Sequence, residues 1–202
     1  MTKRILAIVG LMVMGTSAVL GIDSPSQAGL KLEPQPKEVQ LRDGEFRVSA
    51  RTRIFVQLGH QTEDRIAAET LAEEVEQQSG IKLDILGMAA GKTEDRAIML
   101  ARLDDRRVRH FLAKRGLRAD EAVGANGYLL FSDHSHLIVA ANTGQGLFYG
   151  VQTLRQLLRP AAKGLTCPAV GIRDWPSLQR TTAPDDVSRE EPVKSELRVP
   201  QA

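Results

Sequence analysis

A cluster of glutamates is the first group of side chains in this 202-residue chain with the composition of a catalytic site. Glu73, Glu74 and Glu76 lie within four residues, and a carboxyl group whose pKa is raised can act as a general acid. Apolar residues around them recur at helical spacing, which predicts a helix with all three glutamates on its solvated side. Nothing on that side raises a carboxylate pKa, so we assign them no catalytic role.

Two histidines two residues apart are the candidate metal ligands. His134 and His136 share one face if both are extended, as a metal pair would require. Asp133 is the only third ligand nearby, which favours surface histidines over a metal site. The single cysteine, Cys167, excludes an internal disulfide and a cysteine-based metal site. We therefore predict no metal and no cofactor.

Two glycines, Gly144 and Gly146, lie in the turn between a predicted strand and a predicted helix, and Gly150 lies within that helix. Backbone N–H groups at such a junction can bind a phosphate. The spacing Gly144-x-Gly146-x-x-x-Gly150 matches neither the dinucleotide fingerprint nor a Walker loop. It predicts a tight strand-to-helix turn. A phosphate- or nucleotide-binding domain stays as an alternative, and it would require a parallel sheet.

The unit around that turn is the one that the rest of the chain must support. Residues 136–141 form an apolar, β-branched run typical of a buried strand. In the following segment Leu147, Val151, Leu154 and Leu158 form one apolar stripe of a helix. Such a helix must lie on a sheet, so the remaining segments should supply one.

Those segments alternate between strand and helix signals. Further strands are predicted at 38–41, 45–48, 52–58, 82–86, 97–100, 126–131 and 168–173. Helices are predicted at 62–79, capped by Thr62 or Asp64 and ended by Gly80, and at 104–117. Asp43-Gly44 and residues 132–135 predict two hairpins, which argue against a parallel sheet. Residues 160–168 are predicted to be a linker.

Composition limits the classes of function. The chain is 42% hydrophobic and 26% charged, which suits one globular domain. The net charge of +2, with both signs interspersed, gives no reason to expect a nucleic-acid partner. Aromatic residues make up only 4%, which is low for a face that stacks sugars.

The two ends of the chain read differently from its middle. Residues 1–28 have a basic start, an apolar run at 5–14 and a small-x-small site at 26–28, which predicts a secretory signal peptide. The protein would then be secreted or periplasmic, with no membrane contact after signal removal. Cleavage after Ala18 and an uncleaved membrane anchor are the alternatives. Residues 177–202 are polar and rich in proline, which predicts a disordered tail.

Several segments, taken in order, resemble a known domain. They are Pro34-x-Pro36, Gly127-Tyr128-x-Leu, Ile138-x-Ala140-Ala141, Gly146-x-Phe148-Tyr149-Gly150-x-Gln152-Thr153-Leu-x-Gln156-Leu and Ile172-x-Asp174-Trp175-Pro176. Together they are similar to the N-terminal, non-catalytic domain of bacterial family-20 β-N-acetylhexosaminidases. The resemblance implies an α+β fold over residues 29–176, with a mainly antiparallel sheet and two or three helices packed on one face.

In that family the domain precedes a (β/α)8 barrel, which carries the chemistry. The acetamido oxygen of the substrate attacks the anomeric carbon, one carboxylate orients it, and a glutamate protonates the leaving sugar. The only Asp-Glu dipeptide here, Asp120-Glu121, lacks the preceding His-x-Gly-Gly run of the family. A barrel needs about 200 residues or more, which the tail does not supply. The resemblance thus implies an accessory domain without catalytic residues.

The tail resembles the beginning of that barrel. Leu178-Gln179-Arg180 and Asp185-Asp186-Val187-Ser188-Arg189 are similar to its first strand, and Arg180 stands where the family binds the terminal sugar. Beyond Arg189 the family pattern stops. We interpret residues 177–202 as a remnant of that strand, in a truncated, frameshifted or fragmentary gene product whose Arg180 has no pocket to serve.

Two partners and one rival interpretation follow from the resemblance. The partners would be a catalytic barrel and, by family inference, amino-sugar glycans. The rival is a stand-alone exported module that binds a glycan or another partner. Exposure of Phe148, Tyr149 and Trp175 on an open face would favour sugar stacking, whereas their burial would favour a scaffold.

Overall fold

The computed structural model describes residues 30–89, 94 and 96–176. The predicted signal peptide and tail lie outside the described residues. In chain order the elements are β1 Glu38–Val48, β2 Arg53–Gln57, α1 Gln61–Ser79, β3 Asp84–Met88, β4 Ala97–Arg102, α2 Arg106–Ala113, the 3-10 helix η1 Glu121–Val123, β5 Tyr128–Ser132, β6 His136–Ala141, α3 Gly144–Leu157, β7 Arg159–Ala161 and β8 Gly164–Asp174.

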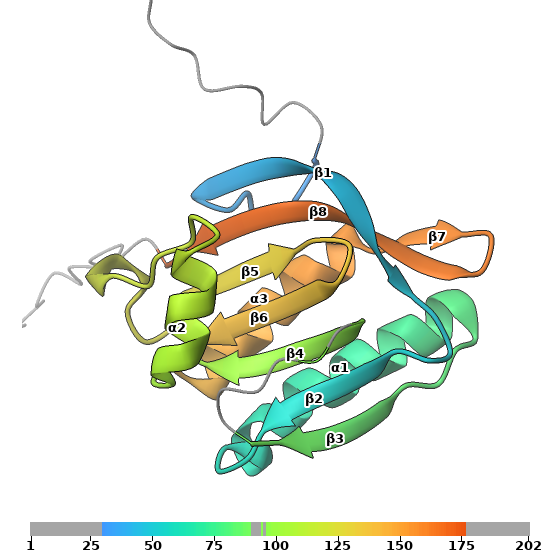
Figure 1. The fold of residues 1–202 in the computed structure, drawn as a ribbon, viewed down its shortest axis with the longest axis horizontal. Coiled ribbons are helices and arrows are strands. Elements are labelled where there is room, and N and C mark those ends of the chain that lie inside the picture. Colours follow the sequence, from blue (N-terminus) through green and yellow to red (C-terminus); the bar gives the residue numbers. More distant parts are fainter. Residues whose placement is uncertain (1–29, 90–93, 95, 177–202) are drawn as a thin grey trace, which may run out of the picture.

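The strands form one sheet in the order β1-β8-β5-β6-β4-β2-β3, and the short β7 pairs with β8 (Figure 1). Four of the seven strand pairings are antiparallel, which confirms the predicted α+β class. The parallel pairs β2–β3, β2–β4 and β4–β6 occupy one half of the sheet. Each of them needs a crossover connection, and α1 supplies the one between β2 and β3.

Helices cover both faces of this sheet. Figure 1 shows α1 and α3 side by side behind it and α2 in front. Alternation along β4 divides the core accordingly, since Ile98 and Leu100 join the α1–α3 side while Met99 and Ala101 join the α2 side. Two helices therefore share one face, and the third packs on the other.

Helix α3 forms as the sequence predicts. Its stripe of Leu147, Val151, Leu154 and Leu158 is buried, and the Thr143 hydroxyl caps it by accepting from the Gly146 N–H at 3.1 Å. The preceding hairpin of β5 and β6 is also confirmed. The local sequence pattern alone therefore predicts the central unit of strand, turn and helix.

Helix α1 ends as predicted but begins differently. Gly80 takes a left-handed conformation with φ of 71°, which closes the helix. At its start the residue before the helix is His60, and no side chain caps it. The predicted caps, Thr62 and Asp64, are wrong because both lie inside the helix, where Asp64 is drawn into the core.

The predicted hairpin at Asp43-Gly44 is wrong. One long strand, β1, runs through it and pairs with β8, and the register shifts between Leu41 and Glu45. Gly44 takes φ of 104° within this irregularity, so the turn signal marks a bulge. The predicted linker at 160–168 is also wrong, because this segment forms strands that pair within the sheet. It contains most of β7 and the first half of β8, the partner that keeps β1 extended.

The two ends of the described fold lie together. Glu38 at the start of β1 is paired with Arg173 at the end of β8, and their side chains form an ion pair at 2.6 Å. The Lys37 N–H also donates to Asp174 Oδ1 at 3.1 Å. The chain thus enters and leaves the sheet at one corner.

Candidate functional site

The glutamates of α1 serve the packing of two helices. Glu73 and Glu76 are exposed, as predicted. The prediction that Glu74 is solvated is wrong, because its side chain is only 15% exposed and pairs with Arg155 on α3. Gln78 also donates to Glu74 at 2.7 Å. The hydrogen bond from Gln78 and the charge of Arg155 hold the pKa of Glu74 below its ordinary value. Glu74 is therefore an ionised partner of Arg155 that links α1 to α3, and not an acid catalyst.

The Asp-Glu dipeptide is also structural. Asp120 caps the short helix η1 by accepting from the Ala122 N–H at 3.1 Å. It also pairs with Arg173, and this contact lowers the pKa of Asp120. Glu121 beside it is exposed. An ionised aspartate held by an arginine cannot protonate a leaving group at neutral pH.

The histidine pair does not assemble a metal site. His134 lies exposed in the turn between β5 and β6, so it does not share a strand with His136. The His136 ring contacts Asp133 at 3.2 Å, and the Asp133 carboxylate accepts the Ser135 and His136 backbone N–H groups. Within the described ranges no three histidine, cysteine or acidic side chains converge as metal ligands.

The glycine turn before α3 is a close contact between elements. A Cβ on Gly144 would lie 3.1 Å from the Glu63 carbonyl oxygen and 3.4 Å from Asp64 Oδ1. Thr143 already accepts the Gly146 N–H. Carboxylates beside a helix N-terminus compete with any bound phosphate, so the turn serves packing, as its spacing predicted.

A buried ion pair beside that turn was missed by the sequence analysis. Arg102 at the end of β4 is 3% exposed and Asp64 is fully buried. The guanidinium donates to both Asp64 oxygens at 2.7 to 3.1 Å, to Glu63 at 2.6 Å and to the Asn142 carbonyl at 2.9 Å. Burial disfavours the charged form of Arg102, but the hydrogen bonds that it donates to Asp64 and Glu63 outweigh this effect and raise its pKa. The cluster joins β4, α1 and the turn before α3.

The residues that carried the family resemblance hold α3 against the sheet. A Cβ on Gly150 would lie 2.4 Å from Val139 Cγ1, so only glycine allows this approach. Tyr128 and Thr153 share a buried hydrogen bond of 2.6 Å, and burial raises the pKa of Tyr128. Gln156 donates to the Glu33 carbonyl at 2.8 Å and thereby fixes the incoming chain.

The outward side of the helical layer is the remaining candidate surface. We call it the helical surface and define it by Ile66 on α1 together with Gln145 and Tyr149 on α3. Ile66 is 65% and Tyr149 40% exposed, and Gln145 donates to the Tyr149 hydroxyl at 2.8 Å. It combines apolar area with amide groups, as protein interfaces do.

The three aromatic rings do not form an open platform. Only Tyr149 is exposed. Phe148 is half-buried against the core, and Trp175 is half-buried with the Arg173 guanidinium 4.7 Å from its ring centre. This arrangement favours the scaffold interpretation over sugar stacking.

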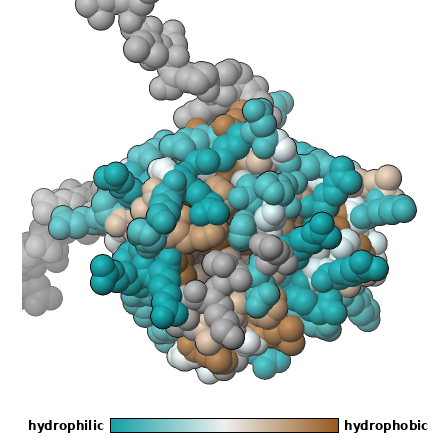
Figure 2. All heavy atoms as spheres, viewed as in Figure 1, coloured by the Kyte–Doolittle hydropathy of each residue, from teal (hydrophilic) through white to brown (hydrophobic). Residues whose placement is uncertain are grey.

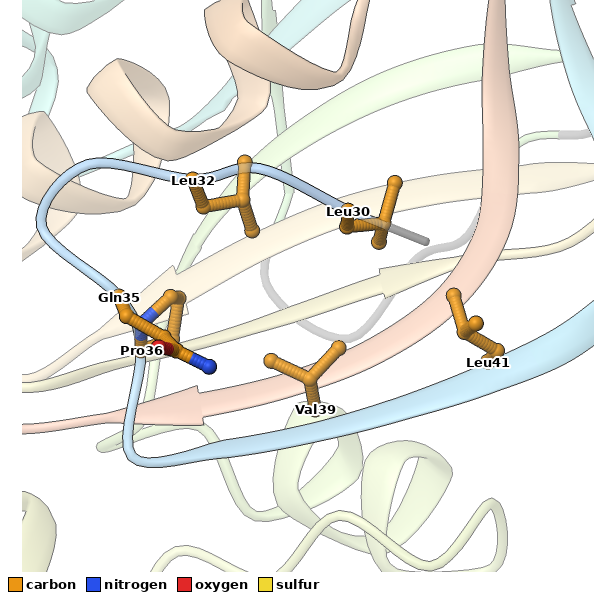
Figure 3. A pocket seen from close by; sticks show the side chains of 6 residues that line it. All are labelled: Leu30, Leu32, Gln35, Pro36, Val39 and Leu41. Atoms are coloured by element: carbon orange, nitrogen blue, oxygen red, sulfur yellow. The ribbon is translucent and has the colours of Figure 1, made fainter. Parts of the chain in front are cut away.

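A small apolar hollow lies where the incoming chain meets β1. Figure 3 shows Leu30, Leu32, Pro36, Val39 and Leu41 around it. Its volume of about 10 Å³ is that of a single water-sized sphere, too small for a sugar ring. In the described part of the chain no helix is both long and apolar enough to cross a bilayer. Arg180, the predicted sugar ligand, lies outside the described residues.

Comparison with known proteins gives the family. Residues 30–175 match the family model "Glycosyl hydrolase family 20, domain 2". The β-N-acetylhexosaminidase of Streptomyces coelicolor A3(2) is similar over 71% of this chain and 26% of its own, with 25% identity and a TM-score of 0.53. The N-acetyl-β-hexosaminidase of Streptomyces plicatus covers the same shares with 26% identity and a TM-score of 0.52.

A more distant structure shares the fold alone. The exo-β-N-acetylglucosaminidase of Vibrio harveyi matches 72% of this chain and 19% of its own, with 15% identity and a TM-score of 0.51. No curated protein sequence matches the chain. The match to the Streptomyces enzymes spans about a quarter of their length. Since the family model covers most of its residues, the chain belongs to glycosyl hydrolase family 20, of which it carries the accessory domain 2.

Proposed function

We propose that this chain supports a family-20 catalytic barrel acting on amino-sugar glycans and that it does not hydrolyse glycosides by itself. The observation that carries the proposal is the use of the motif residues. Gly150, Thr153 and Gln156 all position α3 within the fold. A motif devoted to placing one helix suits a domain whose task is to present that helix.

The positions of the carboxylates support the non-catalytic part. The mechanism described above for the family uses two carboxyl groups at a sugar site, one that orients the acetamido group and one that protonates the leaving sugar. Among the described residues, one hollow is lined by Glu45, another by Glu69 and a third by no acidic side chain. None of the three offers a pair of carboxylates to a sugar.

The helical surface is the proposed contact with the barrel. It lies on the side of α1 and α3 that faces away from the sheet, and it exposes Ile66 and Tyr149. About three-quarters of the length of each Streptomyces enzyme lies outside the part that this chain matches. A barrel in that remaining length is the partner whose contact would remove both apolar side chains from water.

We further propose that the protein is exported and that residues 1–28 are removed as a signal peptide, as the basic, apolar and small-residue pattern suggests. Intact-mass analysis of the protein from culture supernatant or periplasm should show a chain beginning at Gly29. A cytoplasmic protein that retains residues 1–28 would contradict export.

One experiment tests the main proposal. The gene locus is sequenced in all frames on both sides of this coding stretch, and any barrel found there is produced separately. The 202-residue chain alone should release no nitrophenol from 4-nitrophenyl N-acetyl-β-D-glucosaminide, and the barrel should bind it with measurable heat. Turnover by the chain alone, or a locus without a barrel, overturns the proposal.

Variants locate the contact. Ile66→Glu combined with Tyr149→Glu should abolish binding of the barrel. Ile85→Glu, at the 38%-exposed Ile85 on edge strand β3, is the matched control and should bind as the unaltered chain does. Equal losses in both variants would show that the helical surface is not the contact.

A further inference from the structure

We propose that a basic groove at the sheet end nearest the β7–β8 hairpin binds an acidic polysaccharide, that is, a glycan chain bearing carboxylate, phosphate or sulfate groups. The groove is open and has a volume of about 1010 Å³. Its lining includes none of the residues of the family motifs or of the helical surface.

Four separate segments of the chain surround the groove. They are the second half of β1 with the turn into β2, the start of β4, the turn between β5 and β6, and the β7–β8 hairpin. Figure 1 shows why they meet, because β1 leaves the β8 edge and crosses this end of the sheet to reach β2. The second half of β1 pairs with β8 in this region, from Glu45–Pro168 to Val48–Leu165, so these two strands form one continuous part of the lining.

Positive charge dominates its lining. The basic side chains are Arg47, Arg51, Arg96, His134 and Lys163. Glu45 is the one acidic residue of the lining, and it is already paired with Arg47 at 3.0 Å. Among the described residues Arg51, Arg96 and Lys163 have no side-chain partner. Uncompensated cations facing one hollow attract an anion that can contact several of them at once.

Arg96 is placed in the groove at a conformational cost. Its φ is 58°, a left-handed value that non-glycine residues rarely adopt. A hydrogen bond of 2.7 Å from its backbone N–H to the Ser135 carbonyl fixes it beside the turn that carries His134. Strained residues of this kind concentrate at binding sites. The Arg96 backbone is thus fixed against the turn between β5 and β6, which carries His134.

The shape and the remaining lining favour a polysaccharide over other polyanions. Ser49, Thr52 and Thr166 add hydroxyl groups that can meet sugar hydroxyls. No phenylalanine, tyrosine or tryptophan lines the groove, so it lacks the stacking platform that single-stranded nucleic-acid sites use. The apolar residues of the lining are either small, such as Ala161, or buried, such as Leu165. The groove therefore exposes no large apolar side chain that could enter a bilayer. Hydrophilic residues also dominate this side of the molecule (Figure 2).

A binding experiment with a named probe tests the inference. The full chain is titrated with polygalacturonate, a carboxylate polysaccharide, and with uncharged dextran of similar length. We expect polygalacturonate to bind and dextran not to bind. Because screening shortens with salt, affinity should fall roughly tenfold between about 50 and about 200 mM NaCl. Equal binding of dextran would overturn the charge argument.

Charge reversal locates the site. Arg51→Glu combined with Lys163→Glu changes two exposed turn residues, and affinity should fall at least tenfold. Arg106→Glu combined with Arg107→Glu, on the exposed side of α2, is the control with the same change in net charge. It should alter affinity less than twofold. Equal losses in both variants would reduce the interaction to net charge and overturn the site.

Other polyanions complete the test. Binding of phosphatidylglycerol vesicles and, separately, of a single-stranded oligothymidine is measured for the unaltered chain and for both variants. Tighter groove-dependent binding of either one than of polygalacturonate would overturn the polysaccharide assignment. The inference does not rest on the proposed docking of a barrel, because Ile66 and Tyr149 are unchanged throughout.

Discussion

Replacing Asp64 with alanine leaves the guanidinium of Arg102 buried without its main counter-charge. Asp64 is fully buried and Arg102 is 3% exposed, so water cannot solvate the orphaned charge without a structural change. The substitution removes three donor–acceptor contacts between the two side chains. We therefore expect Asp64→Ala to be among the most destabilising single changes outside the apolar core.

The magnitude follows from the partners that remain. Breaking a buried ion pair by removing one member costs about 3 to 5 kcal/mol. Arg102 would keep its contact with Glu63, which is 66% exposed, and with the Asn142 carbonyl. These two contacts place the expected loss near the lower end, at about 3 kcal/mol. For a domain of about 150 residues this lowers Tm by about 9 °C.

Urea unfolding followed by far-UV circular dichroism measures the loss. Glu63→Ala removes the exposed partner of the same guanidinium and should cost less than about 1 kcal/mol. Glu73→Ala, on the exposed side of α1, is the matched control and should stay within about 0.5 kcal/mol of the unaltered chain. The slope with urea should be unchanged, since the same surface is exposed on unfolding.

The pairwise origin of the effect can be isolated. Asp64→Leu combined with Arg102→Met removes both charges, so the double variant should lose less stability than the sum of the two single variants. The reasoning fails if Asp64→Ala costs no more than Glu73→Ala. It also fails if the two single changes are additive.

Three further predictions concern other parts of the fold. Gly150→Ala should lower stability by about 1 to 2 kcal/mol, because overpacking against Val139 exceeds the gain in helix propensity; a higher Tm would contradict this. Burial raises the pKa of Cys167 to about 12, so iodoacetamide at about pH 8 should label the unfolded chain and not the native one; rapid labelling of the native chain would contradict this. The lowered pKa of Glu74 means that its pair with Arg155 stabilises the native state at neutral pH and loses this effect as pH falls through that pKa. The stability difference between the unaltered chain and Glu74→Gln, from urea unfolding, should therefore shrink between about pH 7 and about pH 3, and a constant difference would refute it.

Elements defined by local pattern were predictable from the sequence. Helix α3, with its apolar stripe and glycine turn, and the β5–β6 hairpin needed no knowledge of distant residues. Strand β1 was not predictable in this way, because Asp43-Gly44 is locally a turn signal. What extends β1 is pairing with β8, where contacting residues such as Glu38 and Arg173 are 135 positions apart.

The candidate sites were not predictable for the same reason, because they depend on contacts between residues far apart in the sequence. Asp64 was assigned as a helix cap from its neighbours, but its partner Arg102 lies 38 residues away at the end of another strand. The basic groove carried no motif at all, since its lining comes from four segments that only the crossing of β1 brings together. A basic residue at a strand end, as with Arg96, is too common a pattern to have identified it.

The joined ends of the fold determine how the domain responds to force. Because β1 begins where β8 ends, opposite pulls on Glu38 and Asp174 separate the two strands from one corner. Their backbone hydrogen bonds are then loaded one after another, as in unzipping, and not all together, as in shear. The ion pair between Glu38 and Arg173 and the bond from Lys37 to Asp174 are the first to carry the load.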